Sequence, residues 1–244
     1  DSLEPFLKDR FDDLKQLLTN ELANCFKIDV LGKDVSPLTD DKLTEQVDVI
    51  VSSFLGYLPE LRKTLHDDAL ALYQADPAAK SMLEVMLAYP GFYAVLVYRI
   101  AHFFYDQQVP LIPRIFTELA HIETGIDIHP GAQIGSGFAI DHGSGVVIGE
   151  TAIIGNNVKL YQGVTLGAFS IKEGSSSIKR HPTIGDNVII YAMSTILGGD
   201  TIVGENSIVG GNVWLTRSIL PNSKVYLSQD FDSTYTLIQD NPKS

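Results

Sequence analysis

The sequence predicts an α+β protein in which an N-terminal all-helical domain precedes a parallel β-helix of hexapeptide repeats. An aliphatic residue recurs at intervals of six between Ile128 and Pro221, a period that neither an α-helix nor an alternating β-strand produces. Six residues form one short strand and one turn, so stacked coils share a continuous aliphatic core. Chance alternation in a β-sandwich would not keep this phase over so many repeats. The aliphatic residues in phase are Ile128, Ile134, Ile140, Ile148, Ile154, Leu160, Leu166, Ile184, Ile190, Ile196, Val203, Val209 and Leu215.

The first 125 residues have helical spacing instead. Apolar residues recur there every three or four positions, at Leu7, Phe11, Leu14 and Leu18 and again at Leu43, Val47, Ile50 and Phe54. Ser36-Pro37 and Asp76-Pro77 are typical of helix starts. Gly56 and Tyr89-Pro90-Gly91 are typical of connections. We therefore divide the chain into a helical domain (1–125), a β-helix (126–221) and a polar C-terminal tail (222–244).

The composition is that of an acidic globular protein. Its formal net charge of −12 and its pI of about 4.8 argue against nucleic acid as a partner. No apolar run approaches the roughly 20 residues that span a bilayer, so we expect no membrane segment. The one cysteine, Cys25, cannot form an intramolecular disulfide and fits no metal motif, which favours the reducing cytoplasm.

Two interruptions of the six-residue period are candidates for function, because loops that leave a rigid solenoid commonly carry it. The spacing from Ile140 to Ile148 is eight, and the extra residues fall in the segment 141–145. The spacing from Leu166 to Ile184 is eighteen, without an aliphatic residue in phase. We expect the segment Phe169–His181 to form a loop outside the coil.

The first candidate constellation pairs Asp127 with His142. One coil is about three repeats long, so residues fifteen to eighteen apart can lie on adjacent coils. A carboxylate that binds one imidazole nitrogen leaves the other nitrogen available as a base near neutral pH. A histidine in a solenoid turn more often caps backbone groups than performs catalysis. Its position at an interruption makes the two interpretations about equally favoured.

The second constellation is Arg180-His181 at the end of the expected loop. The planar guanidinium of Arg180 suits a carboxylate or a phosphate, whereas Lys179 reads as part of a solvated basic turn. By local sequence alone, Asp76 is better explained as a helix N-cap and Glu150 as an ordinary polar residue of the coil.

These motifs together resemble the serine O-acetyltransferase family, whose β-helix is left-handed. The resemblance covers about residues 70–209, helical domain included, which distinguishes it from other hexapeptide acyltransferases that share only the coil. The motifs are Ala75-Asp76-Pro77-Ala78, Gly91-Phe92-Tyr93-Ala94, Tyr98-Arg99-Ile100-Ala101-His102, Asp127-Ile128-His129-Pro130, Asp141-His142-Gly143-Ser144-Gly145, Gly149-Glu150, Gly163-Val164-Thr165-Leu166-Gly167 and Arg180-His181-Pro182.

The resemblance implies transfer of an acetyl group from acetyl-CoA to L-serine, the first step of cysteine biosynthesis from serine. By the family motif, His142 is the general base and Asp127 its orienting partner, while Asp141 and Asp76 bind the serine ammonium. The carboxylate is assigned to Arg180, with His181 and Glu150 beside it. No metal is expected. The acetyl-CoA groove is expected near Gly167, Ala168, Ala192 and Gly198.

The resemblance also implies a homo-oligomer, a trimer or a dimer of trimers, with sites between subunits. We expect no complex with O-acetylserine sulfhydrylase, because the chain given ends in Ser244 and not in the isoleucine that the family uses for docking.

Three alternatives stay open. One is an acetyltransferase for another hydroxyl acceptor, such as homoserine or a sugar. Another is a zinc carbonic anhydrase of the same coil, with His129, His142 and His181 as ligands. The third is a non-catalytic relative without a working cofactor site, since Ile208 stands where the family has a lysine.

Overall fold

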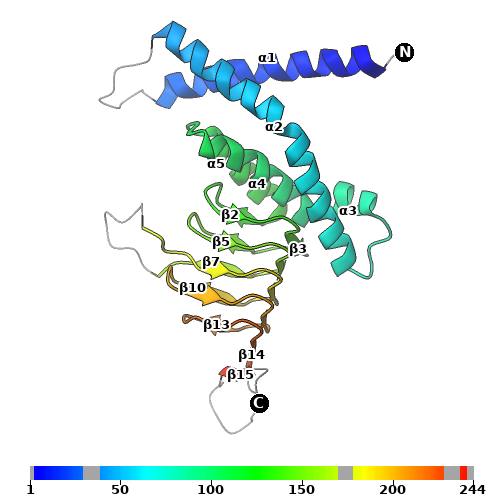
Figure 1. Cartoon of the computed structure of the whole chain (residues 1–244), viewed down its shortest axis with the longest axis vertical. Coiled ribbons are helices and arrows are strands. Elements are labelled where there is room, and N and C mark those ends of the chain that lie inside the picture. The colour runs from blue at the N-terminus through cyan, green and yellow to red at the C-terminus, as the bar shows by residue number, and fades with distance from the viewer. Residues whose placement is uncertain (1–2, 30–38, 170–177, 228–236, 241–244) are drawn as a thin grey trace.

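The computed structural model describes residues 3–29, 39–169, 178–227 and 237–240. Helices lie at one end of a stacked coil, and the C-terminal strands lie at the other end (Figure 1). The helices are α1 (Leu3–Asp29), α2 (Asp40–Ala75), α3 (Met82–Ala88), α4 (Pro90–Asp106) and α5 (Ile112–Thr124).

The coil is a left-handed parallel β-helix whose short strands form three sheets, and it confirms the predicted fold class. Sheet A contains β1 (Asp127–Ile128), β4 (Val147–Ile148), β7 (Thr165–Gly167), β10 (Thr195–Leu197) and β13 (Trp214–Leu215). Sheet B contains β2 (Gln133–Ile134), β5 (Ile153–Ile154), β8 (Thr183–Ile184) and β11 (Ile202–Val203). Sheet C contains β3 (Ala139–Asp141), β6 (Lys159–Tyr161), β9 (Ile189–Ile190), β12 (Ile208–Val209), β14 (Lys224–Leu227) and β15 (Leu237–Asp240).

The in-phase aliphatic residues stack in three columns inside the coil, one from each sheet. In sheet A, for example, Ile128 pairs with Ile148, and Ile148 with Leu166. Because each strand contributes one inward side chain per turn, the six-residue period of the sequence becomes a continuous core. All but one of the thirteen predicted positions are buried, and Ile134 packs partly buried against the others.

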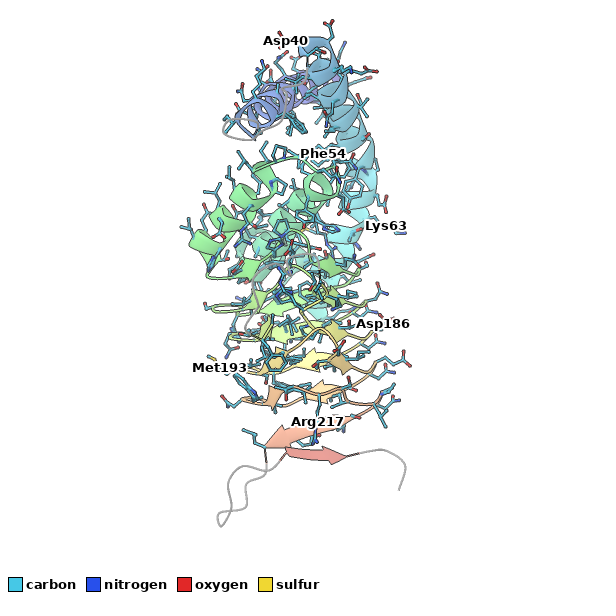
Figure 2. The ribbon with its side chains drawn as sticks, turned by 90° about the vertical axis from the view of Figure 1, so that its left-hand side faces the viewer. Asp40, Phe54, Lys63, Asp186, Met193 and Arg217 are labelled. Carbon is cyan, nitrogen blue, oxygen red and sulfur yellow. The ribbon has the colours of Figure 1, made fainter. Side chains whose placement is uncertain are left out.

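Asparagines with left-handed backbone line the corner between sheets B and C. Their side chains form a ladder, in which Asn157 donates to Asn187 at 3.3 Å and Asn187 donates to Asn206 at 3.1 Å. Asparagine tolerates positive φ better than most residues, which suits it to this turn. Asp186 of this corner and Met193 of the corner between sheets C and A lie on opposite edges of the coil (Figure 2).

A hydrophobic core joins the helices α1, α2, α4 and α5. The helical spacing at Leu43, Val47, Ile50 and Phe54 is confirmed, because all four side chains are buried where α2 meets α1 and α4. The face of α1 that carries Leu7 and Phe11 is helical as predicted, but both of these side chains are exposed.

Several predicted boundaries differ in the structure. Gly56 lies inside α2 and not at a connection, and α2 continues to Ala75. Asp76-Pro77 does not begin a helix: α3 begins six residues later, with Ser81 as its N-cap. The predicted start at Ser36-Pro37 lies outside the described residues.

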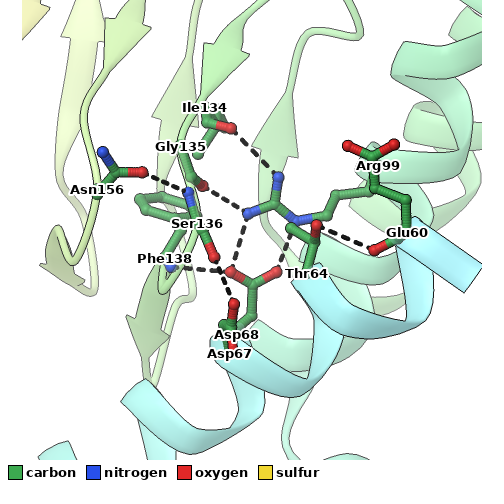
Figure 3. A network of polar contacts seen from close by, with 10 residues as sticks. All are labelled: Glu60, Thr64, Asp67, Asp68, Arg99, Ile134, Gly135, Ser136, Phe138 and Asn156. Carbon is green, nitrogen blue, oxygen red and sulfur yellow. Dashed lines mark hydrogen bonds and ion pairs between the residues drawn. The ribbon is translucent and has the colours of Figure 1, made fainter.

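A buried ion pair joins the helices to the coil (Figure 3). Arg99 of α4 binds Asp68 of α2 through two contacts, of 2.5 and 2.8 Å. The same guanidinium donates to the carbonyl oxygens of Ile134 and Gly135, and Asp68 accepts from the backbone N–H of Phe138. Burial raises the pKa of Asp68, although these donors oppose the shift.

Helix α4 also covers the open end of the coil. A side chain at Gly91 would overlap the carbonyl oxygen of Ile140, so only glycine allows this close approach. The buried Tyr98 donates its hydroxyl proton to the carbonyl of Ala132 at 2.6 Å. Helix α2 packs against β3, and the six residues 76–81 connect α2 to α3.

The coil extends further than the predicted end at residue 221. β14 continues sheet C in parallel, and β15 then pairs with β14 in an antiparallel arrangement. Ser244, on which the expectation about the sulfhydrylase rests, lies outside the described residues. No single described helix has the length and apolarity of a bilayer span; α3 and α4 reach them only together, across a bend of 72°.

Candidate active site

Asp141 and His142 occupy the corner between sheets C and A, at the first interruption of the period. Asp141 ends β3 and is buried, whereas the side chain of His142 is 72% exposed. His142 has a φ of 59°, a left-handed conformation in the turn that leads from sheet C to sheet A. Its Nε2 atom lies 3.9 Å from Oδ1 of Asp141. The turn thus presents an imidazole outside the coil, beside a carboxylate.

Asp76 lies at the same corner, contributed by the turn that follows α2. Its Oδ1 accepts from the N–H of Ala78 at 2.8 Å, and its Oδ2 accepts from the Tyr89 hydroxyl at 2.6 Å. The Tyr89 hydrogen bond lowers the pKa of Asp76, and the charges of Lys159 and His142 contribute to the same shift. The same contact raises the pKa of Tyr89 to about 12. Asp76 is therefore held as an anion near His142, and it is the C-cap of α2 and not the helix N-cap that its local sequence suggested.

Lys159 completes this corner, and the sequence analysis missed it. Its Nζ lies 3.2 Å from Oδ2 of Asp141 and donates to the carbonyl of Ala75 at 2.9 Å. The ammonium also lies 4.4 Å from the centre of the Tyr161 ring. The signal for it in the sequence is the register of the coils. Lys159 follows Ala139 by twenty residues and pairs with it in the adjacent coil, two positions from the candidate Asp141.

Asp127 is not placed against His142 within the chain. The carboxylate within 4 Å of the His142 ring belongs to Asp141. Asp127 begins β1, and its carboxylate lies near Glu118 and His121 of α5. The possible ligand atoms of these three residues lie within 4.8 Å of one another. The length of a coil predicts which residues lie on adjacent coils, but it does not predict that the turn at His142 directs the side chain outward. The orienting role of Asp127 stays a prediction.

Glu150 and Arg180 meet at a different corner, between sheets A and B. The Arg180 guanidinium forms an ion pair with Glu150, whose other oxygen accepts from the Tyr105 hydroxyl at 2.9 Å. Burial acts to raise the pKa of Glu150, but the hydrogen bonds from Arg180 and Tyr105 outweigh it and lower the pKa. The pair therefore orients Arg180 toward this corner, and Glu150 is more than a solvated residue of the coil.

Thr151, also missed by the sequence analysis, fixes His181 at this corner. Its hydroxyl oxygen accepts from the N–H groups of Arg180 and His181, at 2.9 and 3.1 Å. The N–H of Thr151 donates to Nδ1 of His181 at 3.0 Å, which leaves the ring proton on Nε2. Burial, and then the charges of Arg180 and Lys179, lower the pKa of His181 to about 4. The ring lies directly over Gly149, where a side chain would overlap it.

A cavity of about 350 Å³ opens beside Glu150 and Thr151. It is lined by Tyr105, Gly131, Gln133, Glu150, Thr151, Ala152, Ile153 and Lys179. This corner lies between sheets A and B, whereas Asp76, Asp141 and His142 lie at the corner between sheets C and A. One chain thus brings the predicted ammonium ligands together and, separately, the predicted carboxylate ligands.

The four predicted cofactor residues lie at both ends of two strands of sheet A. Gly167 ends β7 and accepts a hydrogen bond from the N–H of Gly198, which follows β10. Ala168 comes next to Gly167, and the ring of the exposed Phe169 lies over Gly198. Ala192 precedes β10 at the other end, in the corner column of His142. The strands between these ends offer the half-exposed Thr165 and Thr195.

The three histidines of the zinc alternative do not converge. His129 accepts from the N–H of Gly131, His181 binds Thr151, and His142 stands exposed at another corner. Within the described ranges, the group with metal-ligand spacing is Glu118, His121 and Asp127, which includes none of the three.

Comparison with known proteins gives one family. Residues 12–96 match the family model described as the N-terminal part of serine acetyltransferase. A serine acetyltransferase encoded on a plasmid of Synechococcus elongatus is 43% identical over 229 residues, which cover 92% of this chain and 72% of that protein.

Solved structures of serine acetyltransferases are similar to this chain as well. Serine acetyltransferase 1 of Entamoeba histolytica in complex with L-cysteine has a TM-score of 0.76 and 38% identity, over 91% of this chain and 78% of its own. The Neisseria gonorrhoeae enzyme in complex with serine has a TM-score of 0.66 and 32% identity, over 87% and 81%.

Proposed function

This chain belongs to the serine acetyltransferase family, and we propose that its two separate corners form one L-serine site where two subunits meet. The chain is an acyltransferase, and its reaction produces O-acetylserine for cysteine biosynthesis. The observation that carries the site proposal is the gathering of Asp76, Asp141 and His142 at one corner, with the imidazole exposed. The N. gonorrhoeae relative was solved with serine, which supports L-serine as the acceptor.

Each corner suits one end of the amino acid. Asp76 and Asp141 are anionic groups that can bind an α-ammonium, and Arg180 has the planar donors that bind an α-carboxylate. Glu150 orients Arg180, and the neutral His181 adds a donor at Nε2. Because these ligands lie at different corners of one chain, a neighbouring subunit would supply the second set. A homo-oligomer is therefore part of the proposal.

His142 is the proposed general base. Its imidazole takes the proton of the serine hydroxyl while the oxygen attacks the acetyl carbonyl carbon. The carbon–sulfur bond then breaks, and the imidazolium returns the proton to the departing thiolate, which leaves as free CoA. A positioned base contributes roughly 10²–10⁴-fold to such a step. The Asp141 carboxylate, 3.9 Å from Nε2 of His142, would stabilise the imidazolium between the two proton transfers.

We propose acetyl-CoA as the cosubstrate, held along the outer face of sheet A. Thr165, Ala168 and Thr195 are small and half-exposed there, which leaves room for an extended pantetheine arm. Ala192 lies at the end of this face nearest His142 in the corner column. No metal takes part in the proposed chemistry.

L-cysteine is a second proposed ligand of the same site. It carries the same ammonium and carboxylate as L-serine, and the E. histolytica relative was solved with it. The cytoplasm stays our prediction for the location, from the single half-buried Cys25.

The test follows release of CoA from acetyl-CoA with a panel of hydroxyl acceptors. L-serine should support release, while L-homoserine and sugars should not. The hydroxyl group of homoserine lies one methylene further from its ammonium and carboxylate, and sugars lack both charged groups. Equal rates with homoserine or a sugar would contradict the assignment of the acceptor.

A further inference from the structure

Lys159 is a buried cation at the edge of the proposed serine site. It occupies an outward-facing position of sheet C, in the same row as Ala139, Ile189, Ile208 and Lys224. Lys224 in this row is exposed, as expected for an outward lysine, but Lys159 is only 9% exposed. Burying an ammonium is costly unless its partners compensate.

The partners of Lys159 come from three elements. Its Nζ lies 3.2 Å from Oδ2 of Asp141 on β3 and donates to the carbonyl of Ala75 at the end of α2. The Tyr161 ring lies against the same ammonium, 4.4 Å from its centre to Nζ. Burial acts to lower the pKa of Lys159, but the hydrogen bonds with Tyr161 and Asp141 outweigh it and raise the pKa, so Lys159 stays charged.

These contacts link the carboxylate of Asp141 to the backbone beside Asp76 through one ammonium. Ala75 is the last residue of α2, and Asp76 follows it directly, so the bond to its carbonyl fixes the backbone that leads into Asp76. The bond to Asp141 fixes the second carboxylate. The carbonyl of Ala75 is one of the acceptors that a helix leaves without an internal partner at its C-terminus, where a cation is favourable.

We propose that Lys159 is a positioning residue that sets the spacing of Asp76 and Asp141 for one substrate ammonium. The inference rests on the proposed serine site. Two carboxylates and one lysine leave one net negative charge, which matches a single α-ammonium. Without Lys159, the nearly buried Asp141 loses its close cationic partner and no longer has a fixed position.

The test compares L-serine with 3-hydroxypropionate, the same molecule without its ammonium group. Lys159→Met and Lys159→Gln should raise the KM for L-serine about tenfold. The inhibition constant of 3-hydroxypropionate and the KM for acetyl-CoA should change less than twofold. A general structural defect would weaken both ligands together, and this outcome would overturn the proposal. Tighter binding of L-serine would also overturn it, because Lys159 would then be a competitor of the substrate.

Three further measurements keep the test decisive. Lys224→Met, in the same row of sheet C, should leave all constants unchanged. Lys159→Gln keeps a donor for Ala75, and Lys159→Arg keeps the charge; if Lys159→Met does not fold, the loss of serine affinity must appear in the glutamine variant and be largely restored in the arginine variant. Wild-type turnover of L-serine is measured first. Its absence refutes the proposed function, whereas an active wild type with an unchanged Lys159→Gln variant refutes only this inference.

Discussion

Arg99 and Asp68 form a two-contact ion pair, at 2.5 and 2.8 Å, between α4 and α2 at the point where both helices meet the coil. The two side chains are 7% and 1% exposed. The guanidinium also satisfies two carbonyl groups of the first coil, so this pair determines how the helices, and with them Asp76, sit above β3.

Arg99→Met should therefore destabilise the protein by about 3–5 kcal/mol, because it leaves Asp68 buried without its cation. Chemical denaturation measures this change in the free energy of unfolding. Arg62→Met, at an exposed position of α2, is the matched control and should change it by less than about 0.5 kcal/mol. A loss below about 1 kcal/mol in Arg99→Met would show that the pair is not important for docking.

His142→Ala should lower kcat by roughly 10²–10⁴-fold, because the proposed base is removed. The stability should fall only by about 1–2 kcal/mol, the cost of an alanine at a φ of 59°, since the side chain itself is 72% exposed. Steady-state kinetics and thermal unfolding check both expectations. A large fall in melting temperature would instead indicate a structural histidine.

The pH dependence of stability should carry the signature of His181. Its folded pKa of about 4 lies below the unfolded value near 6.5, so the unfolded chain binds the proton more readily between these values. Stability should therefore fall as the pH drops from about 6.5 toward 4, by up to about 3 kcal/mol from this group.

His181→Gln removes the titrating group while its amide oxygen can still accept from the N–H of Thr151. The difference in unfolding free energy between pH 7 and pH 4 should shrink in this variant. An unchanged pH dependence would mean that His181 is protonated as easily in the folded chain as in the unfolded one.

The asparagine corner gives a fourth prediction. Asn187 has a φ of 57° and hydrogen bonds to both neighbours of the ladder. Asn187→Ala should cost about 1–2 kcal/mol, because alanine is disfavoured in the left-handed region. Asn187→Gly keeps the backbone conformation accessible and should cost less. Denaturation of both variants separates backbone strain from the ladder; equal losses would assign the effect to the hydrogen bonds.

Much of the coil was predictable from the sequence, because its information is local and repeated. The columns through Ile128, Ile148 and Leu166 follow from a period of six, and each repeat confirms the previous one. The helical face of α2 followed from spacing for the same reason. The boundaries at Gly56 and Asp76 were wrong, since a long helix tolerates one glycine and a turn competes with a helix start for the same Asp-Pro signal.

The site was predictable only in part. The motifs contained Asp76, Asp141, His142, Glu150, Arg180 and His181, and the structure places them at two corners. Thr151 and Lys159 belong to no motif that we recognised. Their roles come from neighbours thirty and more residues away in the chain, His181 for the one and Ala75 for the other.

The amino-acid sequence by itself determined the coil, its aliphatic core and the corner turns, because a repeat of six residues contains its own strand and turn. Only the tertiary structure decided which coil lies beside which and where the helices rest on them. That decision buried Lys159 between α2 and β3, left His142 exposed and kept Asp127 with α5. The physical reason is that hydrophobic periodicity acts over a few residues, whereas the position of a charge depends on every element that excludes water from it.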